Sequence, residues 1–488
     1  MERRRAAERL SLLWAVPSQC SLGKMTPTLP VLLVNTNSMK PLVGPLALDY
    51  LGAALDARGI PSEVLDLALE EDPEDAIASC AASVEPCLVA VTVRNTDDCY
   101  FATRHFLLPK LKETVDGLKE AFQAPLVVGG AGYSVFPREA MRFLGADFGL
   151  HGEGEWALPL LVECLPEGTF HRVPGLLWKR AGRIVSNPCR YGDLATLRLS
   201  PRAWVDNRSY YRLGGMAGIE TSRGCSGTCS YCADPLSKGR AVRFRNPKDL
   251  REEANQLLKQ GVEHFHLCDS ECNLSLDHLF EVCHAFSSLS PVPRWYAYAK
   301  PVPFSREIAQ SMAASGCVGV NFGVDALDPG MLARLGRDHA VSDVAAAVRY
   351  AKESGMRVML DLLLCGPGET VSSLRDTIET AKALPADCVG LSIGLRVYPR
   401  TPLSAFLERE NLLDLSLSDR HMLLPTFFTA PNLPEDPIAF VAGLIQGDSR
   451  FLLPFSEGDN GYNYNDNDLL AQAIQAGERG AFWDILIR

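Results

Sequence analysis

Short apolar runs alternate with amphipathic segments over most of this chain, and they do so in two separate series. Segments with the pattern of helices, such as Leu46–Arg58 and Arg138–Leu144, separate the runs of the first series. This alternation predicts parallel strands joined by helical crossovers. The first series therefore predicts an α/β, doubly wound Rossmann-like sheet whose ligand lies at the carboxyl ends of its strands. The expected strands are Leu32–Val34, Ser62–Leu67, Leu88–Val93, Leu126–Val128 and Phe148–Leu150.

The second series contains six strand–helix units in order along the chain. A right-handed succession of such units predicts a partial parallel (β/α)6 barrel, again with its site at the carboxyl ends of the strands. The expected strands are Gly218–Thr221, His264–Cys268, Arg294–Ala299, Gly319–Val324, Val358–Leu364 and Val389–Val397.

A chain of 488 residues is long for one hydrophobic core, so we expect several domains. The predicted division is a leader at 1–29, a Rossmann-like domain at 30–165, a connector at 166–213, a barrel core at 214–403 and a mostly helical C-terminal region at 404–488. The connector contains a predicted hairpin around Ala181-Gly182. The leader carries a faint likeness to a signal peptide, but a disordered leader or a start at Met25 is the favoured interpretation.

The overall composition excludes several classes of protein. The net charge is −11, which provides no broad attraction for nucleic acid or for anionic lipid. No apolar stretch is long enough to cross a bilayer. The fifteen cysteines are odd in number and irregularly spaced, which argues against a disulfide framework and predicts a reducing, cytoplasmic compartment.

Three cysteines, Cys225, Cys229 and Cys232, follow the first predicted strand of the barrel with the spacing C-x3-C-x2-C. Three thiolates can hold three irons of a four-iron, four-sulfur cluster and leave the fourth iron open for chemistry. The alternatives are a zinc site whose fourth ligand comes from elsewhere, or buried thiols without a metal.

The cysteine run resembles the signature of the radical S-adenosylmethionine (SAM) superfamily, because Tyr231 stands directly before the third cysteine. The resemblance implies a [4Fe-4S] cluster whose open iron binds the amino and carboxylate groups of SAM. It also implies that Tyr231 lies near the adenine of SAM.

Two further strand ends resemble SAM-binding segments of this superfamily. Asp269, Ser270 and Glu271 follow the second barrel strand, where relatives hold the SAM ammonium group, and they supply hydrogen-bond acceptors. The alternative is an acidic helix N-terminus capped by Ser275. Asp325 follows the fourth strand, where a carboxylate of relatives accepts hydrogen bonds from the ribose or amino group of SAM.

The first domain resembles the cobalamin-binding domain that precedes many radical SAM cores, on the segments VLLVNTN, LVVGGAGYSVFP and DFGLHGEGE. The loop after the first strand, at 35–40, contains no histidine, so the resemblance implies a cobalt without a lower histidine ligand. Arg94 or Asn95 is then expected under the corrin ring, and Asp97 and Asp98 are expected to cap a helix at 99–107. The other residues that we assign to the cobalamin site are Gly129, Gly130, Gly152 and Glu153.

Together these resemblances identify the chain as similar to the cobalamin-dependent radical SAM enzymes, of the class B methylase type. They imply that the reduced cluster cleaves SAM to a 5'-deoxyadenosyl radical and that methylcobalamin passes its methyl group to an unactivated substrate carbon. A rearrangement or cyclisation without methylation is the alternative, and a non-catalytic corrinoid-binding protein is a further one. The expected partners are a small-molecule or peptide substrate and an electron donor such as flavodoxin or ferredoxin. No residue is assigned a catalytic role.

Overall fold

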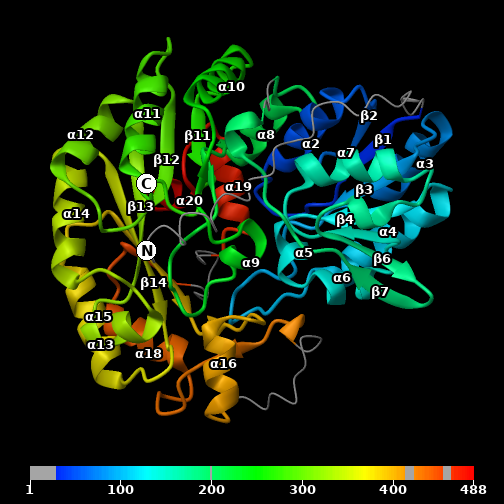
Figure 1. The fold of residues 1–488 in the computed structure, drawn as a ribbon. Coiled ribbons are helices and arrows are strands. Elements are labelled where there is room, and N and C mark those ends of the chain that lie inside the picture. Colours follow the sequence, from blue (N-terminus) through cyan, green and yellow to red (C-terminus); the bar gives the residue numbers. More distant parts are fainter. Residues whose placement is uncertain (1–28, 198–200, 413–421, 454–462) are drawn as a thin grey trace, which may run out of the picture.

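The computed structural model describes residues 29–197, 201–412, 422–453 and 463–488, and Figure 1 shows the arrangement of their elements. All but the last residue of the predicted leader lies outside these ranges. An N-terminal sheet domain stands beside a larger barrel, and both predicted fold classes are confirmed. None of the helices in the described part of the chain is long and apolar enough to cross a membrane.

The N-terminal sheet has the strand order β2-β1-β3-β4-β5-β6-β7, with the first five strands parallel. The predicted hairpin forms and pairs with β5 in the antiparallel direction, so it extends the sheet. Its turn residues Ala181 and Gly182 both have positive φ, 48° and 74°, as a two-residue hairpin turn requires. The strands are β1 (Val31–Asn35), β2 (Ser62–Asp66), β3 (Leu88–Thr92), β4 (Leu126–Gly129), β5 (Phe148–Leu150), β6 (Leu176–Arg180) and β7 (Arg183–Ser186).

Apolar side chains cover both faces of this sheet. Val31 and Leu33 belong to one buried cluster, whereas Leu32 and Val34 belong to the other, as alternation along a strand requires. Residues 99–107 form turns rather than the predicted helix. The helix begins at Leu108, and Pro109 lies in its first turn, where proline is tolerated. The helices are α2 (Leu46–Asp56), α3 (Pro73–Ser83), α4 (Leu108–Ala121), α5 (Ala131–Val135), α6 (Pro137–Leu144) and α7 (Gly154–Cys164), with short 3-10 turns at Phe170–Arg172 and Leu194–Thr196.

The barrel is an open parallel sheet of seven strands in the order β18-β15-β14-β13-β12-β11-β8. Six of them match the predicted strands, and the seventh, β18, has only two residues and no pattern that sequence analysis could detect. Helices α10, α11, α12, α14 and α15 cover its outer side (Figure 1), whereas α13 ends beside the loop at 224–233. The strands are β8 (Ala217–Ile219), β11 (His264–Leu267), β12 (Arg294–Ala299), β13 (Cys317–Asp325), β14 (Arg357–Leu364), β15 (Cys388–Ile393) and β18 (Phe451–Leu452). The helices are α10 (Pro247–Lys259), α11 (Leu276–Ser287), α12 (Arg306–Ala314), α13 (Pro329–Leu335), α14 (Val341–Glu353) and α15 (Val371–Ala383).

The C-terminal elements close the amino end of the barrel. Trp483 meets Tyr296 edge-to-face at 5.9 Å, and Asp484 accepts hydrogen bonds from Tyr296 Oη at 2.8 Å and Arg357 Nε at 2.9 Å. The final helix is therefore a plug at the end opposite the cysteine loop. The remaining elements are α8 (Asn207–Gly214), β16 (Leu395–Arg396), α16 (Pro402–Arg409), β17 (Phe427–Phe428), α18 (Pro437–Ile445), α19 (Asp468–Gln475) and α20 (Phe482–Leu486).

A different C-terminal segment reaches across to the N-terminal domain. Lys40 N donates to Asn465 O at 2.9 Å, and Asn465 Nδ2 donates to Asp98 O at 3.1 Å. Asn465 belongs to a segment rich in Asn, Asp and Tyr at 459–468, of which the structure describes residues 463–468. This segment therefore bridges the loops after β1 and β3.

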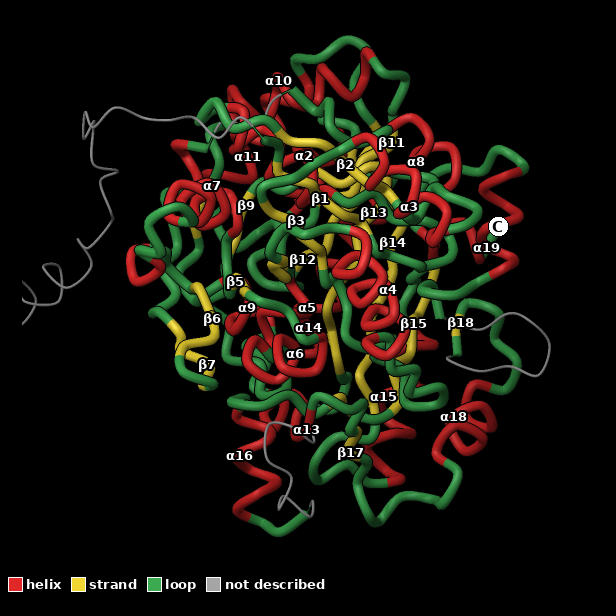
Figure 2. The backbone as a smooth tube through the Cα atoms, turned by 90° about the vertical axis from the view of Figure 1, so that its right-hand side faces the viewer, coloured by secondary structure: helices red, strands yellow, loops and turns green. Residues whose placement is uncertain are grey.

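A buried ionic network joins the two halves, and we call its residues Asp49, Arg202 and Glu253 the domain joint. Arg202 Nε binds Asp49 Oδ2 at 2.6 Å, and Arg202 Nη1 binds Glu253 Oε1 at 2.8 Å, with all three side chains at most 2% exposed. Tyr50 Oη donates to Glu253 at 2.9 Å. Figure 2 shows the N-terminal strands lying over those of the barrel, and the joint holds them in this relation.

Candidate active site

The three cysteines lie on the loop between β9 (Ser222–Arg223) and α9 (Asp234–Lys238), beyond the carboxyl end of β8. Helix α9 lies between the two halves of the molecule (Figure 1), and β9 pairs with β10 (Arg243–Phe244). Gly224 has φ 92°, and a Cβ there would collide with the carbonyl oxygen of Ala241. Glycine is therefore required where the loop begins.

The thiol groups are half-buried and close enough to influence one another. Gly227 N donates to Cys225 Sγ at 3.4 Å. Burial, helped by the neighbouring negative charges of Asp234, Cys229 and Cys225, raises the pKa of Cys232 to about 12. Among the described residues, no three His, Cys, Asp or Glu side chains gather tightly enough to hold one metal ion. A cluster in which each thiolate binds a different iron does not require the three sulfurs to converge on one metal ion.

Tyr231 and Asp325 are 94 positions apart in the sequence and meet beside the cysteine loop. Tyr231 Oη donates to Asp325 Oδ2 at 2.6 Å, and Asp325 is 7% exposed with φ 64°. The strained, left-handed backbone at Asp325 turns its carboxylate towards the loop. The structure thus brings together two residues that sequence analysis assigned to SAM.

Asp269, Ser270 and Glu271 differ in what they contact. Asp269 accepts hydrogen bonds from Thr221 N at 2.7 Å and Ser222 N at 2.9 Å, so it supports the strand before the cysteine loop. Ser270 Oγ donates to Asp234 Oδ2 of α9 at 2.6 Å. Glu271 is half-buried, and burial raises its pKa to about 7. Of the two carboxylates, that of Glu271 is less compensated by neighbouring donors than that of Asp269.

Arg337 is a site residue that sequence analysis missed. Its Nη1 donates to Cys229 Sγ at 3.0 Å, its Nε lies 3.3 Å from Asp325 Oδ2, and its Nη2 lies 3.5 Å from Glu271 Oε1. Nothing in the surrounding segment, which follows the end of α13, distinguishes this arginine from a surface residue in the sequence. Only the fold brings it to the cysteine loop.

Arg94 and Asn95 follow β3 and face the barrel. Arg94 is exposed to the space between the two halves, and its guanidinium contacts the sulfur of Met39, a weak acceptor. Asn95 Nδ2 lies 3.9 Å from the same sulfur. Burial, together with the charges of Arg94 and Lys238, lowers the pKa of His266 on β11 to about 4. Arg94 therefore stands close to the mouth of the barrel with capacity for further hydrogen bonds.

Gly129 and Gly130 end β4 and allow its loop to approach the segment after β3. Gly130 has φ 116°, and a Cβ there would lie 2.7 Å from the carbonyl oxygen of Val93. A larger residue would push these two loops apart. Gly130 thus shapes the strand edge that faces the barrel. Gly129 is half-buried, and a Cβ there would make only ordinary van der Waals contacts.

Gly152 and Glu153 follow β5, and their loop binds the cysteine-loop strands. Glu153 Oε1 binds Arg243 at 2.6 Å and lies 3.5 Å from Arg223, while Gly152 N donates to Ser134 Oγ at 3.0 Å. Arg223 binds the nearby Glu155 at 2.5 Å. The carboxylate of Glu153 is therefore engaged by two guanidinium groups.

Asp97 and Asp98 do not cap a helix, so that expectation was wrong. Asp97 Oδ2 binds Arg396 Nη2 at 2.9 Å, and Asp98 Oδ1 accepts from His105 N at 3.1 Å and Tyr100 N at 3.2 Å. These bonds fold 98–105 into a compact turn and tie it to the segment after β15. A buried arginine from the barrel satisfies the carboxylate that a helix N-terminus would otherwise have used.

We call the region between the inner face of the barrel sheet and the loops after β1 and β3 the chamber. Along β11 and β14, residues that pack against the outer helices are buried, and they alternate with half-buried residues on the inner face of the sheet. The half-buried residues include His266, Asp361 and Leu363. Arg94 and Cys99 remain exposed although they lie between the two halves. The loop after β1 brings no histidine to this edge. A large planar ring would thus meet glycine-rich loops and the guanidinium of Arg94, which fits cobalamin without a lower histidine ligand.

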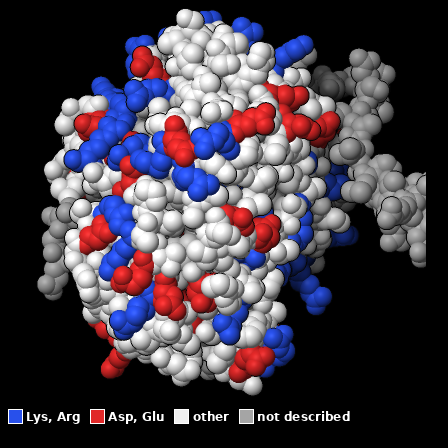
Figure 3. All heavy atoms as spheres, turned by 90° about the vertical axis from the view of Figure 1, so that its left-hand side faces the viewer, with Lys and Arg blue, Asp and Glu red and all other residues white. Residues whose placement is uncertain are grey.

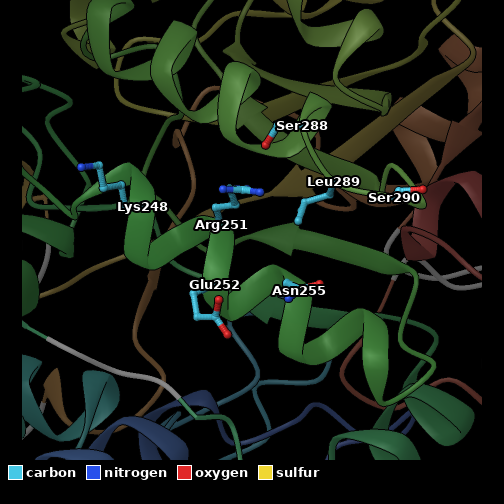
Figure 4. A pocket seen from close by; sticks show the side chains of 7 residues that line it. All are labelled: Lys248, Arg251, Glu252, Asn255, Ser288, Leu289 and Ser290. Carbon is cyan, nitrogen blue, oxygen red and sulfur yellow. The ribbon is translucent and has the colours of Figure 1, made fainter.

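Two surface features lie apart from this chamber. A hollow of about 200 Å³ on the outer side of the barrel shares no residue with the cysteine loop (Figure 4). On the face covered by the outer helices of the barrel, acidic and basic side chains are interspersed (Figure 3). The hollow is lined by Lys248, Arg251, Glu252, Asn255, Ser288, Leu289 and Ser290.

Comparisons with known proteins agree with this geometry. Residues 32–162 match the B12 binding domain, and residues 219–381 match the radical SAM superfamily. The tryptophan 2-C-methyltransferase of Streptomyces laurentii is 29% identical over 93% of this chain and 95% of its own length. The cobalamin-dependent radical SAM enzyme OxsB, at 16% identity and a TM-score of 0.70 over 82% of this chain and 64% of its own, supports the fold alone.

The structure of the radical SAM methyltransferase TsrM from Kitasatospora setae, with tryptophan and a SAM analogue bound, superimposes with a TM-score of 0.85. It is 30% identical and covers 94% of this chain and 97% of its own. A second TsrM structure contains cobalamin and a [4Fe-4S] cluster. These matches span both domains, so the chain is an enzyme that uses the cluster, SAM and cobalamin to methylate an unactivated carbon. It belongs to the cobalamin-dependent radical SAM methyltransferases, the family of TsrM.

Proposed function

We propose that this enzyme methylates a ring carbon of tryptophan or of a closely related aromatic amino acid. Two relatives that align over more than nine-tenths of the chain carry tryptophan in their names or structures. The observation that carries the proposal is the position of Asp361 in the chamber, because a half-buried carboxylate among aromatic rings is suited to an ammonium group attached to an aromatic side chain.

Asp361 lies on β14 with a glycine on each side, Gly323 of β13 and Gly390 of β15. Neither neighbouring position in the sheet places a side chain beside the carboxylate. A Cβ on Gly323 would lie 3.7 Å from Glu271 Oε1. Asp361 is therefore one strand away from the residues that surround the cysteine loop, which is close enough for a substrate to reach the methyl donor.

Three tyrosines lie around this carboxylate, Tyr100, Tyr298 and Tyr464. Burial and, to a smaller extent, the charge of Asp361 raise the pKa of all three phenols, that of Tyr464 to about 12. Tyr100 and Tyr464 meet edge-to-face at 6.4 Å. Neutral phenols at ordinary pH offer aromatic faces and hydroxyl groups to an indole ring.

The cofactors occupy the two edges of this chamber in the proposal. Cys225, Cys229 and Cys232 hold the cluster, while Glu271, Asp325 and Tyr231 contact SAM. When bound, the cluster would supply the electron, SAM the methyl group, and cobalamin the cobalt that carries this methyl group to carbon. On the opposite edge, Arg94 or Asn95 lies under the corrin, beside Gly129 and Gly130.

The remaining assigned residues act less directly. Asp269 and Ser270 orient the loop that presents Glu271, because their side chains are bonded to the β8–β9 segment and to α9. Gly152 and Glu153 hold the N-terminal domain against the strand that leads into the cysteine loop. A small electron carrier such as flavodoxin or ferredoxin delivers the reducing electrons, and replacing a chemical reductant by either purified carrier tests this part.

The test uses full-length enzyme reconstituted with iron, sulfide and cobalamin and incubated with SAM, a reductant and tryptophan. We expect a product that is heavier by one methyl group, together with S-adenosylhomocysteine. SAM with a trideuterated methyl group should transfer all three deuterons, and NMR locates the new group on the ring. Unmodified tryptophan under conditions in which a tryptophan-containing peptide or another aromatic substrate is methylated would refute the substrate.

The matched control replaces each cluster cysteine by alanine. The variants should lose iron and all methylation while they retain cobalamin. Methylation that survives in these variants would refute the assignment of the cluster to Cys225, Cys229 and Cys232.

A further inference from the structure

Arg337 touches a cluster cysteine directly, and the proposed substrate plays no part in this contact. Its Nη1 donates to Cys229 Sγ at 3.0 Å, and its Nη2 donates to the carbonyl oxygen of Gly323. The side chain is only 5% exposed. Its positive charge is therefore little screened by water and acts at short range on one ligand of the cluster.

The fold holds Arg337 in place through the end of α13. Ser230 N, between the second and third cysteines, donates to Leu335 O at 2.9 Å, and Thr228 Oγ1 donates to Gly336 O at 3.1 Å. Gly336 has φ 75°, and a Cβ there would collide with the carbonyl oxygen of Thr228. The helix end and the cysteine loop are thus fastened together directly beside Arg337, which limits the freedom of its side chain.

Asp325 and Glu271 share the charge of Arg337. Asp325 Oδ2 lies 3.3 Å from Nε, and Glu271 Oε1 lies 3.5 Å from Nη2. Asp325 also accepts the hydrogen bond of Tyr231, which precedes the third cysteine. The guanidinium is therefore balanced between the sulfur of Cys229 and two carboxylates, and a change in either carboxylate alters the charge that the sulfur experiences.

We propose that Arg337 is a positioning residue that raises the reduction potential of the [4Fe-4S] cluster through its hydrogen bond and charge at Cys229. Reduction adds one electron to the cluster, and no proton or bond change accompanies it. A fixed positive charge and an N–H donor at a cluster sulfur stabilise the more negative, reduced form. Asp325 opposes this effect because it neutralises part of the charge of Arg337.

The experiment is a potentiometric titration of the reconstituted full-length enzyme, followed by the EPR signal of the reduced cluster without SAM or substrate. At a fixed solution potential, Arg337→Met should lower the ratio of reduced to oxidised cluster about tenfold, which corresponds to 59 mV for one electron. Arg337→Lys, which keeps the charge but loses the fork of donors, should give a smaller shift of the same sign.

Asp325→Asn should shift the ratio in the opposite direction, since Arg337 then keeps its full charge at the sulfur. Arg334→Met is the matched control, because this exposed arginine of α13 lies against Gly368. It should leave the potential unchanged. Iron content per chain, measured for every variant, shows whether the cluster is fully loaded.

An Arg337→Met enzyme with full iron content and an unaltered or higher potential would overturn the proposal. If that variant does not hold iron, the Arg337→Lys and Asp325→Asn enzymes decide. Shifts of the same sign in these two variants, or no shift in either, would also overturn it. Because no substrate is present, these outcomes are independent of whether tryptophan is methylated.

Discussion

Two carboxylates, Asp49 in the domain joint and Glu271 beside the cysteine loop, differ in how their charge is compensated. Asp49 is fully buried and accepts four hydrogen bonds, from Arg202 at 2.6 Å, Asn207 at 2.9 Å, Trp204 N at 3.0 Å and Val205 N at 3.1 Å. Glu271 is half-buried, and its contact with Arg337 is 3.5 Å long. One carboxylate has its acceptor capacity filled, and the other does not.

This difference separates a structural carboxylate from one that is prepared for a ligand. Donors around Asp49 replace the water that burial removes, so its charge stabilises the joint. Burial without enough donors raises the pKa of Glu271 to about 7, which means that the protein alone does not stabilise its charge. A bound cation such as the ammonium group of SAM would complete its environment.

Removing Asp49 should have the largest effect on stability. Asp49→Ala leaves Arg202 buried with one carboxylate partner fewer, so the free energy of unfolding should fall by about 3–5 kcal/mol. Denaturant unfolding of the full chain measures it. The exposed Arg58–Glu163 pair, at 2.9 Å, provides the control, since Glu163→Ala should cost about 1 kcal/mol or less. Equal losses for both variants would contradict the structural role of the joint.

Asp361→Asn should reduce kcat/KM for tryptophan about 10- to 100-fold, because hydrogen bonds to charged groups are worth about 1.5–3 kcal/mol. Indole-3-propionate, which lacks the ammonium group, should react equally slowly with wild-type and variant enzymes. Steady-state methylation of both compounds measures the difference. An equal loss for the two compounds would mean that Asp361 does not recognise the ammonium group.

Glu271→Gln should weaken SAM binding about tenfold at pH 8, the smaller end of the range for a lost charged partner. The carboxylate of the wild type, with a pKa of about 7, is ionised above pH 7 and neutral below it. SAM affinity of the wild type should therefore fall as the pH drops through 7, and the Gln variant should lack this dependence. Calorimetric titration between pH 6 and pH 8, on either side of that pKa, measures both.

The stability of Glu271→Gln, measured as its free energy of unfolding, tests whether Glu271 differs from Asp49 in its contribution to the fold. A carboxyl group whose folded pKa lies above its ordinary value of 4.5 destabilises the ionised folded state, so stability falls as the pH rises from about 4.5 to about 7. Glu271→Gln should remove this fall and should not lower the free energy of unfolding at pH 8. A loss as large as that of Asp49→Ala would remove the distinction between the two carboxylates.

Thr370→Ala should have the smallest effect on the free energy of unfolding, and it serves as a control for the effect of stability on SAM binding. Thr370 caps α15 through a bond from Ser373 N at 3.1 Å, and losing such a cap costs about 1 kcal/mol. SAM affinity should not change. A change in SAM affinity would show that stability and binding are coupled in this barrel, and the Glu271 result would then need correction for it.

Regular elements were largely predictable from local patterns. The burial alternation of β11 and β14 follows their apolar pattern, and α11 and α15 begin after Ser275 and Thr370, which cap them. The turns at 98–105 were not predictable, because a buried bond from Arg396, 299 positions away from Asp97, competes with helix formation. Strand β18 was missed since its two residues pair only through the fold.

The two βα series, the cysteine triad and the absence of a histidine after β1 could be read from the sequence, because each is a local pattern of residue types. Which of the predicted polar residues keep capacity for a ligand depends on long-range packing. Asp269 and Glu153 are engaged by backbone amides and guanidinium groups, whereas Glu271 and Arg94 are left with weaker partners. The tertiary structure also brought Arg337 to Cys229, since long-range packing decides which side chains meet.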